Sequence, residues 1–157
     1  MKMYFKQRLF SWLDSYDIFD ENGNTIYTVE SQLSWGHCLH ILDASGHDIG
    51  VVKEQILTIM PRFAIYADGE QIGMIYRNFT FFHPSYTIDF NGWQVEGDIM
   101  TWNYTITDSQ HSLIAEINKD LFNLTDCYCI NTVYPEDALV VLMTVLAIDA
   151  DKCSHSD

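Results

Sequence analysis

The chain has 157 residues, enough to bury a hydrophobic core within one ordinary domain. Hydrophobic residues make up 48% of it and aromatic residues 14%, which excludes a disordered chain. The formal net charge of −14, with only eight Lys and Arg residues, disfavours a nucleic-acid partner, because phosphates are bound largely by basic side chains.

The N-terminal residues 1–13 alternate between polar and apolar side chains and lack the continuous apolar run of a signal peptide. We therefore expect a cytoplasmic location. In that compartment we expect the cysteines to remain reduced thiols. The four cysteines are Cys38, Cys127, Cys129 and Cys153.

Turn-forming sequences recur along most of the chain, and Asn-Gly and Asp-Gly pairs among them favour tight hairpins. Between the turns lie short runs rich in Tyr, Phe, Ile, Val and Thr, such as residues 63–66 and 104–107, which are typical of half-buried strands. This pattern predicts a mainly β, antiparallel barrel or sandwich. The turns lie at residues 20–23, 43–46, 68–69, 91–92 and 108–110.

Near the C-terminus the pattern changes to that of a helix, predicted at about residues 136–150. Pro135 suits a first helical turn, and residues 138–148 have no polar stripe, so such a helix would be buried on all sides. The run is too short to span a membrane, which takes roughly 20 residues. A buried strand is the alternative interpretation of this segment.

The inside of a wide barrel is the place in a β protein that surrounds a helix. A barrel of about eight strands has room only for side chains, so we expect more than eight strands. The number of turns supports about twelve, six before residues 69–70 and six after them. The predicted fold is a closed antiparallel barrel of about twelve strands enclosing one C-terminal helix. Residues 1–151 would form this single domain and residues 152–157 a flexible tail.

An internal repeat appears at a shift of about 65 residues. Residues 41–43 match residues 106–108, Phe63 matches Tyr128, and Lys53 matches Lys119 after a small slip. Two related halves of about six strands each would explain these matches; coincidence among strands of similar composition is the alternative.

A shorter pattern recurs four times, with a basic residue nine or ten positions before an aromatic-x-Ile sequence. If equivalent strands bring these basic residues to one rim, they would form a small site for an anion or a lipid head group. The alternative is that their aliphatic stems cover apolar surface while their charges stay in water. The four residues are Lys6, Lys53, Arg77 and Lys119.

The sequence predicts no metal site and no cofactor. His37 and His40 are three apart, so on a strand they would face opposite sides and share no ion. Cys127 and Cys129 would share a face, but a soft metal needs further donors. The tryptophans are expected to pack in the core rather than line a ligand cavity; they are Trp12, Trp35, Trp93 and Trp102.

Residues 5–12, 79–86, 92–97 and 145–149 resemble the LURP-one-related family, a branch of the Tubby-like and phospholipid-scramblase-like superfamily, and in particular its bacterial members. The resemblance implies a twelve-stranded barrel around a C-terminal helix. Tubby-like relatives bind phosphoinositide head groups through clustered basic residues, and scramblase-like relatives carry a membrane anchor and acylated cysteines. This chain shows neither a basic cluster nor an anchor, so no site residues are carried over.

No catalytic motif is present, and we assign no catalytic residue. The favoured hypothesis is a non-enzymatic binding domain that contacts a lipid head group or a protein partner on the outer wall or rim, with peripheral membrane contact at most. Self-association also stays open. The alternatives are an enzyme whose site is built from dispersed strand residues, and a small-molecule carrier.

Overall fold

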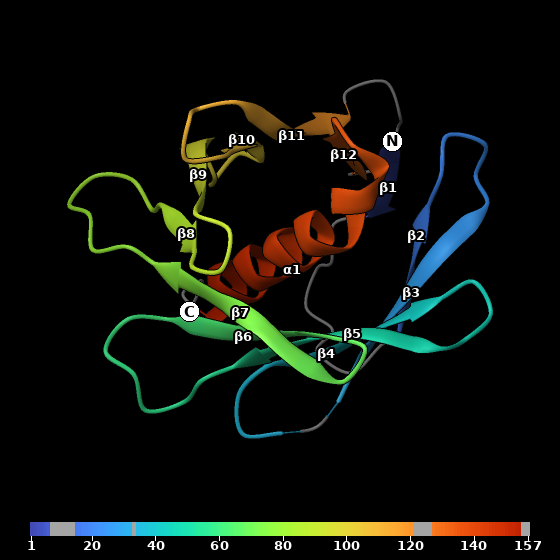
Figure 1. Cartoon of the computed structure of the whole chain (residues 1–157), viewed down its shortest axis with the longest axis horizontal. Coiled ribbons are helices and arrows are strands. Elements are labelled where there is room, and N and C mark those ends of the chain that lie inside the picture. The colour runs from blue at the N-terminus through green and yellow to red at the C-terminus, as the bar shows by residue number, and fades with distance from the viewer. Residues whose placement is uncertain (7–14, 33, 121–126, 155–157) are drawn as a thin grey trace.

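The computed structural model describes residues 1–6, 15–32, 34–120 and 127–154. It shows a closed barrel of twelve antiparallel strands around one helix, which confirms the predicted fold class (Figure 1). The strands are β1 (Lys2–Lys6), β2 (Tyr16–Phe19), β3 (Thr25–Ser31), β4 (Cys38–Asp43), β5 (Asp48–Glu54), β6 (Arg62–Ala67), β7 (Glu70–Arg77), β8 (Tyr86–Ile88), β9 (Trp93–Asp98), β10 (Asn103–Thr107), β11 (Leu113–Asp120) and β12 (Cys127–Thr132).

Each strand pairs with its neighbours in the chain, and β1 closes the barrel by pairing with β12, for example Met3 with Ile130. Because successive strands alternate in direction, their connections fall at two opposite ends. At one end, called the turn rim, lie residues 20–24, 44–47, 68–69, 89–92, 108–112 and 133–137. At the other end, called the loop rim, the described connections contain residues 34–37, 55–61, 78–85 and 99–102.

Several tight turns at the turn rim are built by an aspartate. Oδ1 of Asp20 accepts hydrogen bonds from the backbone N–H groups of Asn22 (2.8 Å) and Asn24 (2.9 Å). Asp43 and Asp108 accept the equivalent bonds from residues two and four positions further on. These bonds hold the pKa of all three carboxyl groups below its usual value. Part of the negative charge of the chain therefore stabilises hairpins.

The helix α1 (Ala138–Ser154) follows a 3-10 turn, η1 (Pro135–Asp137), and runs inside the barrel from the turn rim to the loop rim (Figure 1). Every residue from Val141 to Ile148 is at most 1% exposed. The one hydroxyl in this stretch, on Thr144, donates to the backbone carbonyl of Val140 at 2.8 Å. The helix is thus the centre of the core, as its apolar sequence predicts.

The helix is longer than predicted. It continues to Ser154, so residues 152–154, predicted as part of a flexible tail, are helical. The sequence placed the end near residue 150 because the apolar run stops at Ile148. The polar residues of the last turn instead find partners on the strands and loops at the loop rim.

The repeat-related positions fall on strands six apart in the chain. Phe63 lies on β6 and Tyr128 on β12, and both are 1% exposed. Lys53 and Lys119 each occupy the second-last position of their strands, β5 and β11. These equivalences support the predicted duplication of a six-stranded half.

Replacing Leu142 with Asp should unfold the barrel. Leu142 is fully buried, and an unpaired carboxylate there should cost on the order of 4 kcal/mol or more, against a typical stability of about 5–15 kcal/mol. Leu57→Asp is the matched control, because Leu57 is 100% exposed. Urea denaturation followed by circular dichroism measures both. A wild-type midpoint for the Leu142 variant would show that the helix is not the core.

Candidate functional site

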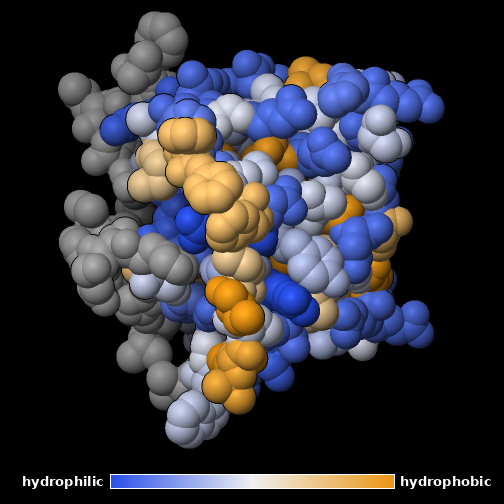
Figure 2. Space-filling model, turned by 90° about the vertical axis from the view of Figure 1, so that its left-hand side faces the viewer, coloured by the Kyte–Doolittle hydropathy of each residue, from blue (hydrophilic) through white to orange (hydrophobic). Residues whose placement is uncertain are grey.

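The loop rim carries the most exposed apolar side chains of the described chain. Exposure runs from 48% for Ile56 to 100% for Leu57 and Ile59, and every member of the set except Ile56 is at least 62% exposed, whereas no exposed apolar residue that the structure describes at the turn rim exceeds 55%. Figure 2 shows hydrophobic side chains gathered in a band down the face that carries the loop rim. We call the exposed apolar residues of this rim the apolar band; they are Trp35, Ile56, Leu57, Ile59, Phe79, Phe81, Phe82 and Met100. An exposed band of this kind marks an interaction surface.

Backbone and side-chain bonds close the two largest described loops at their bases. The N–H of Asn78 donates to the carbonyl of Ser85 (2.8 Å), and its side-chain amide donates to Ser85 Oγ and Thr87 Oγ1. In the neighbouring loop the N–H of Gln55 donates to the carbonyl of Arg62 at 2.8 Å. With their bases fixed, the loops hold their apolar tips away from the barrel.

Basic residues are concentrated at one end of the barrel, whereas acidic residues lie at both ends. The turn rim and its adjoining strand ends carry Asp20, Glu21, Asp43, Asp48, Asp68, Glu70, Asp89, Asp108, Glu136 and Asp137. Most of the basic residues in the described ranges lie at the opposite end: Lys6, Lys53, Arg62, Arg77, Lys119 and Lys152. A strongly acidic chain thus has one end where cations and apolar side chains occur together.

The four basic residues singled out from the sequence all lie at or next to the loop-rim ends of their strands, β1, β5, β7 and β11. The strand order separates them into two pairs, because β1 and β11 flank β12 whereas β5 and β7 flank β6 on the opposite arc. Lys53 and Lys119 are exposed, and Arg77 is half-buried; the side chain of Lys6 lies outside the described residues. A single anion site made of all four stays a prediction.

Arg77 contacts the end of the helix. Asp151, only 2% exposed, accepts a hydrogen bond from the hydroxyl of Tyr86 and one from Nη1 of Arg77 at 3.2 Å. Burial, and then the bond to this carboxylate, raise the pKa of Tyr86. Arg77 and Tyr86 flank residues 78–85, so the helix end is joined to the loop that carries the phenylalanines.

Two further contacts join the last helical turn to other loops. Nζ of Lys152 donates to the carbonyls of Ile99 (3.0 Å) and Met100 (3.2 Å) and lies 4.1 Å from the ring centroid of Trp102. Nε2 of His37 lies 2.8 Å from Oγ of Ser154. We call these contacts, together with those of Asp151, the helix-end clamp. The sequence did not reveal it, because it depends on the rotation of the helix within the barrel.

The prediction that the tryptophans pack in the core is confirmed for two of the four. Trp93 (6% exposed) and Trp102 (3%) pack in the core. Trp35 was expected to do the same, but that prediction is wrong, because it lies in a loop and is 87% exposed; Trp12 lies outside the described residues. The four cysteines are thiols, as expected.

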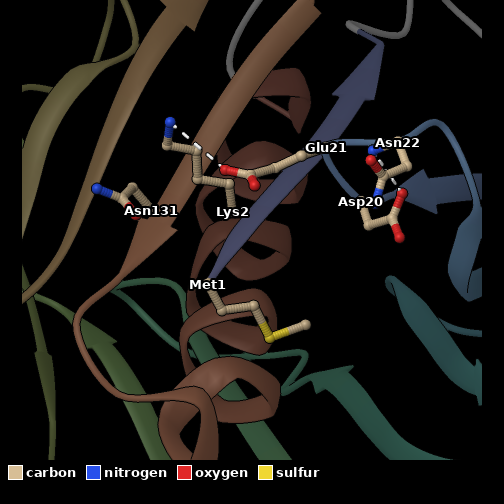
Figure 3. A pocket seen from close by; sticks show the side chains of 6 residues that line it. All are labelled: Met1, Lys2, Asp20, Glu21, Asn22 and Asn131. Atoms are coloured by element: carbon tan, nitrogen blue, oxygen red, sulfur yellow. Dashed lines mark hydrogen bonds and ion pairs between the residues drawn. The ribbon is translucent and has the colours of Figure 1, made fainter.

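A depression of about 360 Å³ lies at the turn rim (Figure 3). Nζ of Lys2 pairs with Oε1 of Glu21 at 3.5 Å, and Asp20 is occupied in its own turn. The charged groups of the depression thus already satisfy one another, and we assign it no function. Its lining residues are Met1, Lys2, Asp20, Glu21, Asn22 and Asn131.

Comparison with family models finds a match to the LURP-one-related model over residues 1–149. The chain belongs to the LURP-one-related family. The match spans the whole barrel and most of the helix, so both halves and the enclosed helix belong to the family fold. A search of curated proteins finds no match.

Among solved structures, the chain is similar to a protein from Arabidopsis thaliana known from its X-ray structure. The TM-score is 0.66 at 14% sequence identity, and the alignment covers 96% of this chain and 90% of the plant protein. A likeness at this identity shows a shared fold alone. Function has to be argued from the surface of this chain.

Replacing Tyr86 with Phe should weaken the helix-end clamp. The substitution removes a hydrogen bond to a buried carboxylate, which should lower the free energy of unfolding by about 1.5–3 kcal/mol. Tyr134→Phe is the matched control, since Tyr134 is 55% exposed. Urea denaturation measures both changes, and equal midpoints for the two variants would contradict the clamp.

Stability should also fall at alkaline pH. Burial raises the pKa of both Tyr86 and Tyr104, so the folded chain keeps these phenols neutral while the unfolded chain ionises above about pH 10. The stability that the neutral phenols contribute is therefore complete below about pH 10, and it is lost as the pH rises above that value. Urea midpoints on either side of this pH measure the loss, which Tyr104→Phe should reduce. An unchanged midpoint across this range would contradict the prediction.

Proposed function

We propose that this chain is a non-enzymatic binding domain that docks reversibly on a lipid bilayer through its loop rim. The carrying observation is the apolar band, whose side chains project from separate loops at one end of the barrel. No helix of the described residues is long and apolar enough to cross a membrane, so the proposal is peripheral contact. The cytoplasmic location expected from the sequence is part of the proposal.

The energy available to the band suits reversible docking. Burying one large apolar side chain contributes about 1.5–3 kcal/mol, so Leu57, Ile59, Phe81 and Phe82, each at least 85% exposed, would together contribute on the order of 6 kcal/mol or more. One myristoyl chain binds membranes with a constant of about 10⁴ M⁻¹, equivalent to about 5.5 kcal/mol. The loop tips are thus comparable to one lipid anchor.

Charge would orient the domain on an anionic bilayer. The acidic turn rim is repelled, whereas exposed Lys53, Arg62 and Lys119 lie near the loop rim. Charges of this kind steer approach more than they add to affinity, and salt weakens them. We therefore expect apolar insertion to dominate and anionic lipid to strengthen binding.

The geometry favours a bilayer over a protein partner. A protein must match the relief of the surface that it covers, and stable interfaces have a packed apolar centre. Here the most exposed side chains lie on different loops, and Leu57 and Ile59 are fully exposed at the tip of theirs. A fluid bilayer accepts separate protrusions without shape complementarity.

Vesicle flotation at low salt tests this proposal. The wild-type chain should float with phosphatidylcholine vesicles and more strongly when phosphatidylserine is included. The double variant L57D/I59D should reduce the bound fraction at least tenfold, because charged side chains resist insertion. The matched control is L113D/Y134D, which adds the same charge at exposed apolar positions near the turn rim and should bind like wild type.

Two outcomes would overturn the proposal. The first is a wild-type chain that floats with neither kind of vesicle at low salt. The second is a wild-type dimer in size-exclusion chromatography that L57D/I59D converts to a monomer, because the band would then be covered by a second copy. Circular dichroism confirms that all variants are folded.

A further inference from the structure

A second group of chemically active side chains lies on the outer wall of the barrel, separate from the apolar band. Cys38 and His40 are two apart on β4, so their side chains lie on the same face of the strand. The next residue, Ile41, is fully buried and faces the core, so Cys38 and His40 face outward. Gln32 follows β3 and is paired to β4 through its N–H, which donates to the carbonyl of Cys38 at 2.9 Å. Asp48 begins the neighbouring strand β5.

Three donor atoms of this group form a small triangle. Sγ of Cys38 lies 3.7 Å from Nε2 of His40 and 3.8 Å from Oε1 of Gln32, and the last two atoms are 3.0 Å apart. They supply one sulfur, one imidazole nitrogen and one carbonyl oxygen. Zn²⁺ is bound in proteins by sulfur, nitrogen and oxygen atoms of side chains. Here the oxygen comes from an amide instead of a carboxylate.

We propose that Cys38, His40 and Gln32 bind Zn²⁺ or a related divalent transition-metal ion. Tetrahedral zinc bonds of about 2.3 Å to S, about 2.05 Å to N and about 2.1 Å to O place S and N about 3.6 Å apart, S and O about 3.6 Å, and N and O about 3.4 Å. The observed triangle has edges of 3.7, 3.8 and 3.0 Å. Only small side-chain rotations are needed to close it on an ion.

Asp48 supplies the support that a metal-binding histidine requires. Its Oδ2 lies 2.6 Å from Nδ1 of His40. A carboxylate on one ring nitrogen fixes the orientation of the imidazole and directs the lone pair of the other nitrogen toward the ion. Here that other nitrogen is Nε2, which faces Cys38 and Gln32.

The ligand set leaves an open coordination position. Among the described residues, no three His, Cys, Asp or Glu side chains converge on one point. The third ligand of the proposed site is therefore the amide oxygen of Gln32. A fourth position remains for water or an exogenous ligand.

The same Asp–His–Cys order would also describe an activated nucleophile. Cys38 is only 7% exposed, whereas a reactive cysteine is accessible to its substrate. Metal binding is therefore the better use of this geometry.

Titration of the reduced, folded chain with Co²⁺, followed by absorption spectroscopy, tests the site. We expect one equivalent to bind, with tetrahedral d–d bands and a thiolate-to-cobalt charge-transfer band that Zn²⁺ displaces. Cys38→Ser should abolish the charge-transfer band, and Asp48→Asn should weaken binding roughly 10–100-fold. Cys129→Ser and His47→Ala are the matched controls and should bind like wild type.

The site is wrong if the wild-type chain binds neither ion stoichiometrically, or if Cys38→Ser keeps the charge-transfer band. If iodoacetamide alkylates Cys38 rapidly, the rate depends on His40, and Zn²⁺ gives no protection, Cys38 is a nucleophile and not a metal ligand. Vesicle flotation of Cys38→Ser should match wild type, so this inference and the proposed function succeed or fail independently.

Discussion

The whole structure depends on burying one helix that has no polar side. A lone α1 would expose apolar residues in every direction, and only a closed sheet surrounds it completely. The strands in turn need the helix, because a barrel of this width has space inside that strand side chains alone do not fill. At Gly50, an added Cβ would overlap the Met143 side chain, which shows how closely the wall approaches the helix.

Filling the barrel also decides where function can lie. With the interior occupied, ligands are left with the two rims and the outer wall. The turn rim uses its aspartates to build hairpins, and the depression at this rim is polar, with Lys2 paired to Glu21. The loop rim has the opposite character, because its loops are fixed at their bases and end in apolar side chains. The helix-end clamp links the core to this rim through Asp151 and Lys152.

Parts of the sites were within reach of the sequence. The spacing of two between Cys38 and His40 is visible in the sequence, and the alternation of side chains along a strand, which separates His37 from His40, places this pair on one face. Gln32 and Asp48 were out of reach, because their positions depend on the pairing of β3, β4 and β5. The Phe-rich segment of residues 79–82 carries part of the family resemblance, and nothing local in its sequence distinguishes these phenylalanines from core residues.

The sequence by itself determined the barrel, its strand number and the enclosed helix, because turn chemistry and hydrophobic periodicity are local properties of the chain. Only the tertiary structure decided which apolar residues stay outside: Trp35 is exposed and Trp102 is buried, although both are tryptophans next to turns. It also decided that Asp151 ends inside, paired with Arg77, which lies 74 residues earlier in the chain. Such outcomes follow from strand order and helix rotation, which place residues far apart in sequence side by side.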